Sequence, residues 1–445
     1  MASVAFLGFQ AHNPIVFLPL AGFLLLGYTG IILIERGWSR SFVASLLAIL
    51  LTYVWLKKYT FLPEALFIHS PYFTLGLSYI FFRVLHLLIE TRDCREKQHI
   101  RFGAYLLYTL NFTTLVSGPI QQYDEFARDQ FANEPLALGP RVVGLQLERI
   151  IRGFFKVNVL AMLLNMVRED AYAQLFQPVH FSIKIFAAIK LAVAYLFFLY
   201  ANFSGYIDIV IALARLMRVR LPENFDRPFS ASSYIDFWNR WHITLSTWMK
   251  TYVYNPLLMV LMRRIPSPGL APFLGVFCFL VAFFLIGVWH GRTSEFIFLG
   301  VLLGMGVAIN KLWQLGLARA LGRKGYKALA SNAAYIAFGS GLTFCWTAFA
   351  GSWFWANWQQ IGKLFAVFGG LQWCGIWLMI WMCMTVALAF WEAMRAMLLS
   401  IKTSEGPILT SRYARVVYAS ALGLVALVMA ILLNQPVPPI VYKAF

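Results

Sequence analysis

Long apolar runs alternate with short polar connections along the whole chain. A helix of about 20 apolar residues crosses the hydrocarbon core of a bilayer, and most of the runs are of that length or slightly shorter. The pattern predicts an all-α integral membrane protein, a polytopic bundle of about eleven transmembrane or re-entrant helices. The apolar runs occupy residues 14–34, 40–56, 72–90, 102–118, 147–167, 182–200, 270–289, 296–313, 333–355, 374–398 and 412–434.

The stretch from Leu213 to Pro268 interrupts this pattern because most of it is too polar to span a membrane. Within it, Ser233 precedes Asp236 by one helical turn, a spacing typical of a helix N-terminus. Apolar residues then recur every three or four positions, which predicts one amphipathic helix from Asp236 to Leu257. Its aromatic face consists of Phe237, Trp238, Trp241, Leu245 and Trp248.

This amphipathic segment has two interpretations. Periodicity alone favours an interfacial helix whose Trp and Tyr side chains lie at the level of the lipid headgroups. His242 is then a polar residue at the edge of the aromatic face. The alternative is a helix inside the bundle that presents His242 to a substrate.

Composition supports the membrane assignment, since 60% of the 445 residues are hydrophobic and only 13% are charged. A soluble globular domain is about half apolar. No linker, low-complexity tract or repeat marks a boundary, so a single membrane domain over residues 1–445 is expected. Residues 1–13 lack the basic region of a cleavable signal, which predicts that the first apolar run is retained as a signal anchor.

The formal net charge is +18, and many of the basic residues lie in short loops between apolar runs. Anionic lipid headgroups and the retention of basic loops on the cytoplasmic side account for this bias, so membrane lipid is an expected partner. No basic stretch carries a stacking or groove-binding pattern, and nucleic acid is not expected to bind.

His290 is the first candidate for chemistry, because it ends an apolar run and is bracketed by Gly287 and Gly291. An ionisable residue at membrane depth indicates a functional site, although a histidine at a helix end can also bond to the last carbonyls. The two glycines indicate a close approach of backbone or ligand. One apolar run and a loop separate His290 from His242, so the two can meet inside a bundle.

A neutral imidazole is suited to accept a proton from a hydroxyl group, whose oxygen then attacks an acyl carbon. Acyl transfer is therefore the chemistry that this histidine pair favours. The sequence contains no GxSxG elbow, so a covalent acyl-enzyme is not expected. It contains no phosphate-binding or dinucleotide-binding glycine pattern, so use of ATP or NAD is not expected. It contains no HExxH, HxH or paired-cysteine spacing, so a metal site is not expected.

Polar islands elsewhere have less specific interpretations. Asn202, Ser204 and Asp208 follow the run at 182–200, where hydrogen bonding between helices explains them without catalysis. The segment SGPIQQYDEF, residues 117–126, carries the Gly-Pro signal of a turn followed by an acidic patch.

Taken together, these segments resemble the membrane-bound O-acyltransferase (MBOAT) family, in its bacterial branch of alginate O-acetylation and D-alanyl transfer proteins. The similarity covers most of the motif-bearing core, about residues 110–300. It runs in order through SGPIQQYDEF, IIRGFFKVNVLAMLL, the long block from NFSGYIDIV to TYVYNPL, and GVWHG.

The resemblance implies a ring of tilted helices, with amphipathic interfacial helices, around a central tunnel. His290 matches the catalytic base of the family and His242 its accessory histidine. The donor is an acyl thioester, on coenzyme A or on the phosphopantetheine arm of an acyl carrier protein, and no cofactor is bound. Residues expected at the tunnel are Asn202, Ser204, Asp208, Trp238, Asn239, Arg240, Trp241 and Trp289.

The implied acceptor is a hydroxyl of a cell-surface or exported polysaccharide, reached directly or through an extracytoplasmic transferase, at the inner or plasma membrane. Acetyl transfer is favoured, with D-alanyl transfer to teichoic acid and a non-catalytic transporter or scaffold as the alternatives. The chain departs from alginate-type members at Asn202, where Asp is usual, and at Leu303-Gly304, where His-Gly is usual. Its end, PPIVYKAF, is similar to the aromatic tail of those members.

Overall fold

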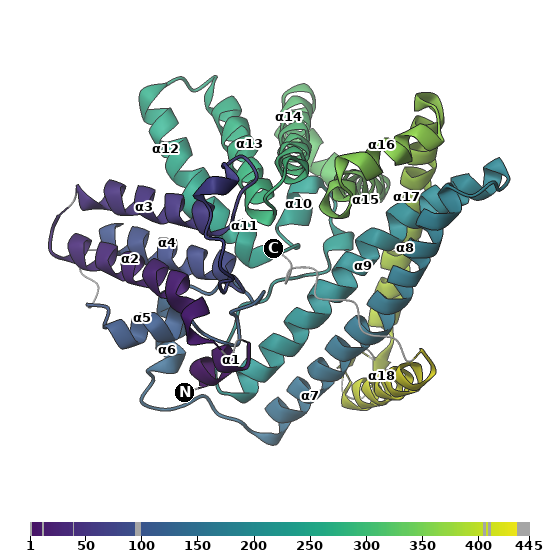
Figure 1. The fold of residues 1–445 in the computed structure, drawn as a ribbon. Helices are drawn as coiled ribbons and strands as arrows, with labels where there is room; N and C mark the ends of the chain where they lie inside the picture. The colour runs from purple at the N-terminus through teal and green to yellow at the C-terminus, as the bar shows by residue number, and fades with distance from the viewer. Residues whose placement is uncertain are drawn as a thin grey trace. The chain divides into compact units, whose positions relative to one another are not determined.

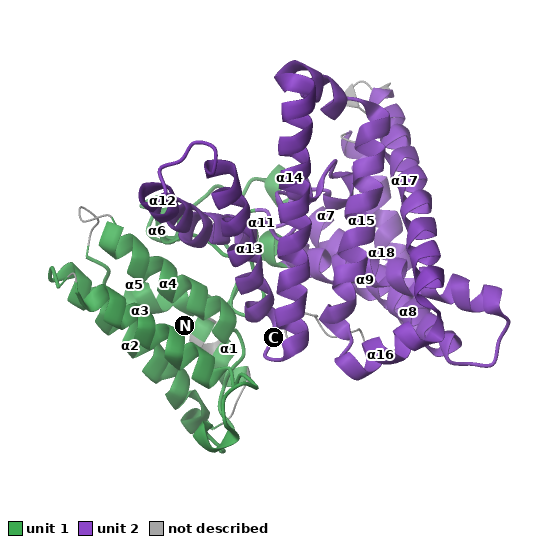
Figure 2. Cartoon of the chain, turned by 90° about the horizontal axis from the view of Figure 1, so that it is seen from above, with its two compact units in different colours: residues 1–143, 210–222, 442–445 green, residues 144–209, 223–441 purple. Residues whose placement is uncertain are grey.

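The computed structural model describes residues 2–10, 13–38, 40–93, 99–403, 406–407 and 411–433. The C-terminal PPIVYKAF lies outside these described residues. The chain forms two compact units, shown in Figure 2. Among the described residues, unit 1 comprises those up to residue 143 together with 210–222, and unit 2 comprises 144–209 and those from 223 onward. The expected single domain over residues 1–445 stays a prediction.

Unit 1 is built on helices α2, α3 and α4, which pack against one another (Figure 1). Apolar residues at helical spacing, among them Phe23, Ile31, Ile49 and Ile80, fill the space between them and are almost fully buried. The elements of this part of the chain are α1 (Ala2–Gln10), η1 (Pro14–Phe17), α2 (Leu18–Glu35), α3 (Ser41–Leu56), η2 (Glu64–Leu66), α4 (Leu77–Asp93), α5 (Phe102–Thr109) and α6 (Tyr123–Gln130).

The apolar run at 102–118 is not one helix, because α5 ends at Thr109. The buried side chain of Arg83 on α4 donates hydrogen bonds to the backbone carbonyls of Thr109 (2.8 Å) and Thr114 (2.7 Å). Carbonyls inside a continuous helix are occupied by its own N–H groups. The chain therefore turns here, and the turn satisfies the guanidinium group.

The remaining elements lie mostly in unit 2, and α7 and α9 have residues in both units. Helices α12, α13, α14, α15 and α17 pack in succession, and Figure 2 shows α14, α15 and α17 side by side. The elements are α7 (Pro140–Phe155), the π-helical turn η3 (Lys156–Ala161), α8 (Met162–Leu175), α9 (Phe181–Leu216), η4 (Pro228–Ser230), α10 (Tyr234–Trp238), α11 (Ile243–Met249), the π-helical turn η5 (Lys250–Tyr254), α12 (Asn255–Arg264), α13 (Ala271–His290), α14 (Ser294–Ala330), α15 (Ala333–Trp355), α16 (Trp358–Val367), α17 (Gly370–Ser400), the paired strands β1 (Lys402–Thr403) and β2 (Gly406–Pro407), and α18 (Arg412–Leu433).

Eight helices among the described residues are long and apolar enough to cross a membrane, and the shorter α3 is also apolar. The prediction of a multi-pass, helical membrane protein is confirmed, whereas the count of about eleven helices is not. Two of the predicted runs account for much of the difference. The run at 102–118 breaks after α5, and the run at 72–90 is helical only from Leu77 and buries Arg83 and His86.

The predicted continuous helix from Asp236 to Leu257 is wrong, because α10 ends at Trp238 and α11 begins only at Ile243. The loop at residues 224–226 pairs with the backbone at this break. The N–H of Asp226 donates to the carbonyl of Arg240 (2.9 Å), and the N–H of Ile243 donates to that of Asn224 (3.0 Å). These long-range bonds replace those of a helix.

The hydroxyl of Ser233 accepts from the N–H of Asp236, so the predicted N-cap is confirmed. The aromatic face is packed inside unit 2 and not exposed, which contradicts the interfacial-anchor interpretation. Its five members, each at most 8% exposed, are Phe237, Trp238, Trp241, Leu245 and Trp248.

Candidate histidine site

His242 occupies the break between α10 and α11 with a φ of 45°, in the left-handed region that residues other than glycine rarely adopt. Its side chain is only 1% exposed. The ring of Phe203, on α9, stands edge-on to the imidazole with centroids 5.1 Å apart. Aromatic packing and the backbone pairing at the break therefore fix where this ring lies.

Asn224 holds one edge of the His242 ring. Its Oδ1 lies 3.2 Å from His242 Nδ1. The same oxygen accepts from the backbone N–H of Thr244 (3.1 Å) and from the Thr244 hydroxyl (2.9 Å). All three residues are buried, so this small network is closed off from bulk water.

Burial lowers the pKa of His242 from its ordinary value of 6.5 to about 3. The cause is desolvation, which disfavours the charged imidazolium. At neutral pH the ring is therefore a neutral imidazole, the form that can accept a proton.

His290 is the last residue of α13 and is 4% exposed. Its ring packs against Trp289, with centroids 4.8 Å apart, and against Phe354 of α15 at 5.0 Å. The Trp289 ring also faces His242 at 6.3 Å. One indole thus contacts both imidazoles, and the two histidines predicted from sequence share one region of unit 2.

The glycines that bracket Trp289 and His290 allow close packing, as predicted. A Cβ at Gly287 would lie 2.3 Å from the Cα of Gly300 on α14. A Cβ at Gly291 would lie 2.0 Å from the ring of Phe296. Contact between helices therefore explains both glycines.

The tryptophans of the broken segment pack against other aromatic residues of unit 2. Trp238 packs on Phe283 of α13, with centroids 4.8 Å apart, and Trp241 stacks on Phe237 at 5.5 Å. Asn239, in contrast, is exposed. Their role at a tunnel stays a prediction.

Arg240 and Asp208 are engaged in ion pairs. Arg240 Nε donates to Asp236 (2.9 Å). Asp208 accepts from Arg149 (2.9 Å) and Lys156 (2.7 Å). A carboxylate between two cations is a structural link between helices, as one of the interpretations of these polar islands held.

Asn202 and Ser204 lie on α9 on either side of Phe203, and both are buried. Ser204 Oγ has no hydrogen-bond partner among the residues that the structure describes. Both residues are chain neighbours of Phe203, whose ring contacts His242, and their role at a tunnel stays a prediction.

No sequence motif marks the residues found around the two imidazoles, which include Phe203, Asn224, Thr244 and Phe354. The sequence could have indicated the break at His242, because a histidine followed by the β-branched residues Ile and Thr has low helix propensity. The pairing of Asn224 with His242 depends on a loop that no periodicity describes.

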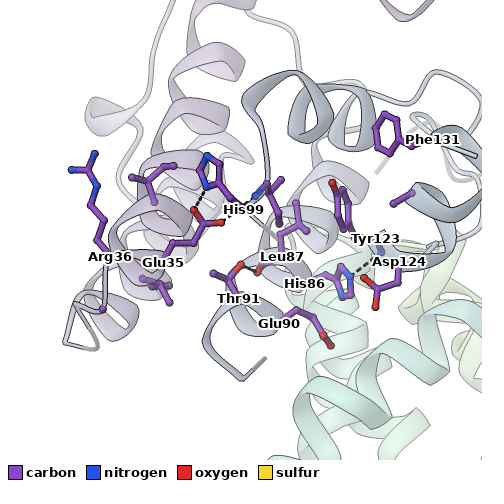
Figure 3. Close-up of a pocket in the computed structure, with 15 residues that line it drawn as sticks. Glu35, Arg36, His86, Leu87, Glu90, Thr91, His99, Tyr123, Asp124 and Phe131 are labelled. Atoms are coloured by element: carbon purple, nitrogen blue, oxygen red, sulfur yellow. Dashed lines mark hydrogen bonds and ion pairs between the residues drawn. The ribbon is translucent and has the colours of Figure 1, made fainter. Parts of the chain in front are cut away.

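A cavity of about 1300 Å³ lies within unit 1 (Figure 3). Glu35 pairs with His99 there, and His86 Nε2 accepts the backbone N–H of Tyr123 (3.0 Å). Asp124, from the predicted turn and acidic patch at 117–126, also lines it. In the part of the chain that the structure describes, no three His, Cys, Asp or Glu residues are grouped so that they could hold a metal ion.

Comparisons with known proteins match this chain to a family and to several relatives. A model of the membrane-bound O-acyltransferase family matches residues 38–346. A teichoic acid D-alanyltransferase of Streptococcus thermophilus is 33% identical over 54% of this chain and 57% of the relative. A probable alginate O-acetylase of Pseudomonas syringae pv. tomato is 31% identical over 53% and 42%. A peptidoglycan O-acetyltransferase of Helicobacter pylori is 32% identical over 48% and 38%. The chain thus spans about half the length of the curated relatives it matches.

Proposed function

Since the chain belongs to the membrane-bound O-acyltransferase family, we propose that it transfers an acyl group from a thioester to a hydroxyl of a cell-surface or exported polysaccharide. The observation that carries this proposal is the pair of buried imidazoles that both pack against Trp289. A neutral imidazole beside a bound hydroxyl is the minimum that direct acyl transfer requires.

In the proposed reaction, His290 accepts the proton of the acceptor hydroxyl, and the hydroxyl oxygen attacks the thioester carbonyl. The carbon–sulfur bond breaks, and the thiolate takes up the proton as the thiol leaves. His242 orients or polarises groups at the reacting centre. The proposed reaction requires no covalent acyl-enzyme and no oxidant.

The proposed donor is coenzyme A or the phosphopantetheine arm of an acyl carrier protein, presented from the cytoplasm. It reaches the histidines through a central tunnel lined by Trp238, Trp241 and Trp289. The protein resides in the inner or plasma membrane, and the acceptor receives the acyl group directly or through an extracytoplasmic transferase.

Acetyl is the proposed acyl group. The side chains identified around the two imidazoles are uncharged: Phe203, Asn224, Thr244, Trp289 and Phe354. An uncharged acetyl group enters such surroundings at lower cost than D-alanyl, whose ammonium would lose its hydration. D-alanyl transfer to teichoic acid is the second candidate, because a D-alanyltransferase is among the relatives.

Mass spectrometry of cell-surface polymers from cells with and without the gene tests the proposal. Loss of acetyl esters is the expected result, and loss of D-alanyl esters would instead support the second candidate. Unchanged esters of both kinds, together with no thioester consumption by the purified protein, would favour a transporter or scaffold.

A further inference from the structure

The orientation of the Asn224 carboxamide can be assigned from its hydrogen bonds. An amide oxygen only accepts and an amide nitrogen only donates. The atom named Oδ1 lies 3.1 Å from the backbone nitrogen of Thr244, which carries a hydrogen and can only donate. That atom is therefore the oxygen.

This orientation determines the tautomer of His242. The oxygen of Asn224 can only accept, so the hydrogen of the 3.2 Å bond to His242 Nδ1 belongs to the histidine. A neutral imidazole carries one N–H, and the lone pair then resides on Nε2.

We infer that Asn224 is a positioning residue that holds His242 as the Nδ1–H tautomer, so that Nε2 is the nitrogen that accepts a hydrogen bond from bound substrate. This inference rests on the proposed acyl transfer and adds the state in which His242 takes part. In this state Nδ1 of His242 donates to Asn224, and Nε2 is available as a hydrogen-bond acceptor.

An aspartate at position 224 would accept the same three hydrogen bonds, from His242 Nδ1 and from the N–H and hydroxyl of Thr244. The presence of an amide in place of a carboxylate therefore needs an explanation. The Nδ2 of Asn224 is buried and has no hydrogen-bond partner among the described residues, an arrangement that costs stability. A carboxylate would avoid that cost, but its charge would favour the imidazolium, whose Nε2 donates. The amide thus keeps Nε2 an acceptor.

Three of the side chains that contact His242 are Phe203 from α9, Trp289 from α13 and Asn224 from the loop before the break. None of these three titrates in the physiological range. The titratable neighbour that follows Trp289 is His290, and a change at Asn224 leaves its aromatic contacts untouched.

Asn224→Asp in the full-length protein tests the inference through the pH dependence of acyl transfer. We expect the rate of acyl transfer at pH 7 to fall by about tenfold or more. The acidic limb of the pH–rate profile should shift to higher pH by about one unit or more, and the rate should recover at high pH. Asn224→Leu, which accepts no hydrogen, is expected to lose activity at every pH. A wild-type pH profile for Asn224→Asp would overturn the inference.

Thr244→Val serves as the matched control, because it removes one donor to the same oxygen and keeps the backbone N–H and the side-chain shape. Its pH profile should match that of the wild type. An equal shift in Thr244→Val would mean that the network acts only through packing, and would count against Asn224 as the residue that sets the tautomer.

A measurement that does not depend on activity separates this inference from the proposed function. In protein labelled with ¹⁵N-histidine, the signals lost in His242→Gln identify His242, and the inference expects a protonated Nδ1 and an unprotonated Nε2. A protonated Nε2 would overturn the inference even if acyl transfer is observed. An Nδ1–H tautomer in a protein that transfers no acyl group would overturn the proposed function while the assignment of the tautomer stands.

Discussion

The indole of Trp289 stands against the imidazole of His242, with ring centroids 6.3 Å apart, and it also packs on His290, its neighbour in the chain. One residue at the end of α13 thus brings together two histidines that are separated in sequence by a loop and an apolar helix. The surroundings of His242 are aromatic and buried, which favours its neutral imidazole over the charged form.

Replacing His290 with Ala should reduce acyl transfer by about 100-fold or more, since loss of a general base typically costs that much. Replacing His242 with Ala should also reduce it, because the reacting groups lose the side chain that orients them. Both variants should reach the membrane in normal amounts. The measurement is ester content of the polymer per amount of membrane protein. His180→Ala, at an exposed histidine, is the control and should behave as wild type. Retained acylation in His290→Ala would refute its assignment as the base.

Gly287→Ala should destabilise the packing of α13 against α14. The new Cβ would lie 2.3 Å from the Cα of Gly300, a contact with backbone that no side-chain rotation relieves. A cost of about 1–3 kcal/mol is expected from such overpacking. Thermal unfolding in detergent measures it. Gly316→Ala is the matched control within α14, because nothing lies within 4 Å of its Cβ, and it should leave the melting temperature unchanged or slightly higher.

The apolar runs predicted most helices well because hydrophobic length alone decides whether a helix can span a bilayer. The errors arose where buried polar groups act over long distances in sequence. Arg83 donates hydrogen bonds to the carbonyls of Thr109 and Thr114, and α5 ends at Thr109. Asn224 pairs with the backbone of Ile243 and so divides the predicted amphipathic helix.

The candidate site shows the same division. His290 and its two glycines could be found from sequence, because an ionisable residue at membrane depth and small neighbours are local features. Asp208 has the same local appearance, yet the structure places it between Arg149 and Lys156. Only tertiary contacts distinguish a buried polar residue that is already paired from one that faces a reacting group.

Asp208→Asn should lower stability without changing the rate per folded molecule, because it leaves Arg149 and Lys156 without their shared carboxylate. Removing one partner of a partly buried ion network is expected to cost about 1–3 kcal/mol. Adding Lys156→Met should restore part of that loss, and this double-mutant cycle measures the coupling. A strong fall in kcat at unchanged melting temperature would instead place Asp208 in the chemistry.

His242 should also make folding sensitive to acid. Its pKa is about 3 in the folded protein against 6.5 in the unfolded chain. Between these two values the unfolded chain binds the additional proton, so this group lowers stability as pH falls from 6.5 toward 3 and has no effect above about pH 7. His242→Gln lacks that proton and should lose less of its melting temperature between pH 7 and pH 5 than the wild type. Parallel melting curves for the two proteins over this range would show that His242 is hydrated or protonated in the folded state, and would contradict the neutral imidazole on which its role as an acceptor depends.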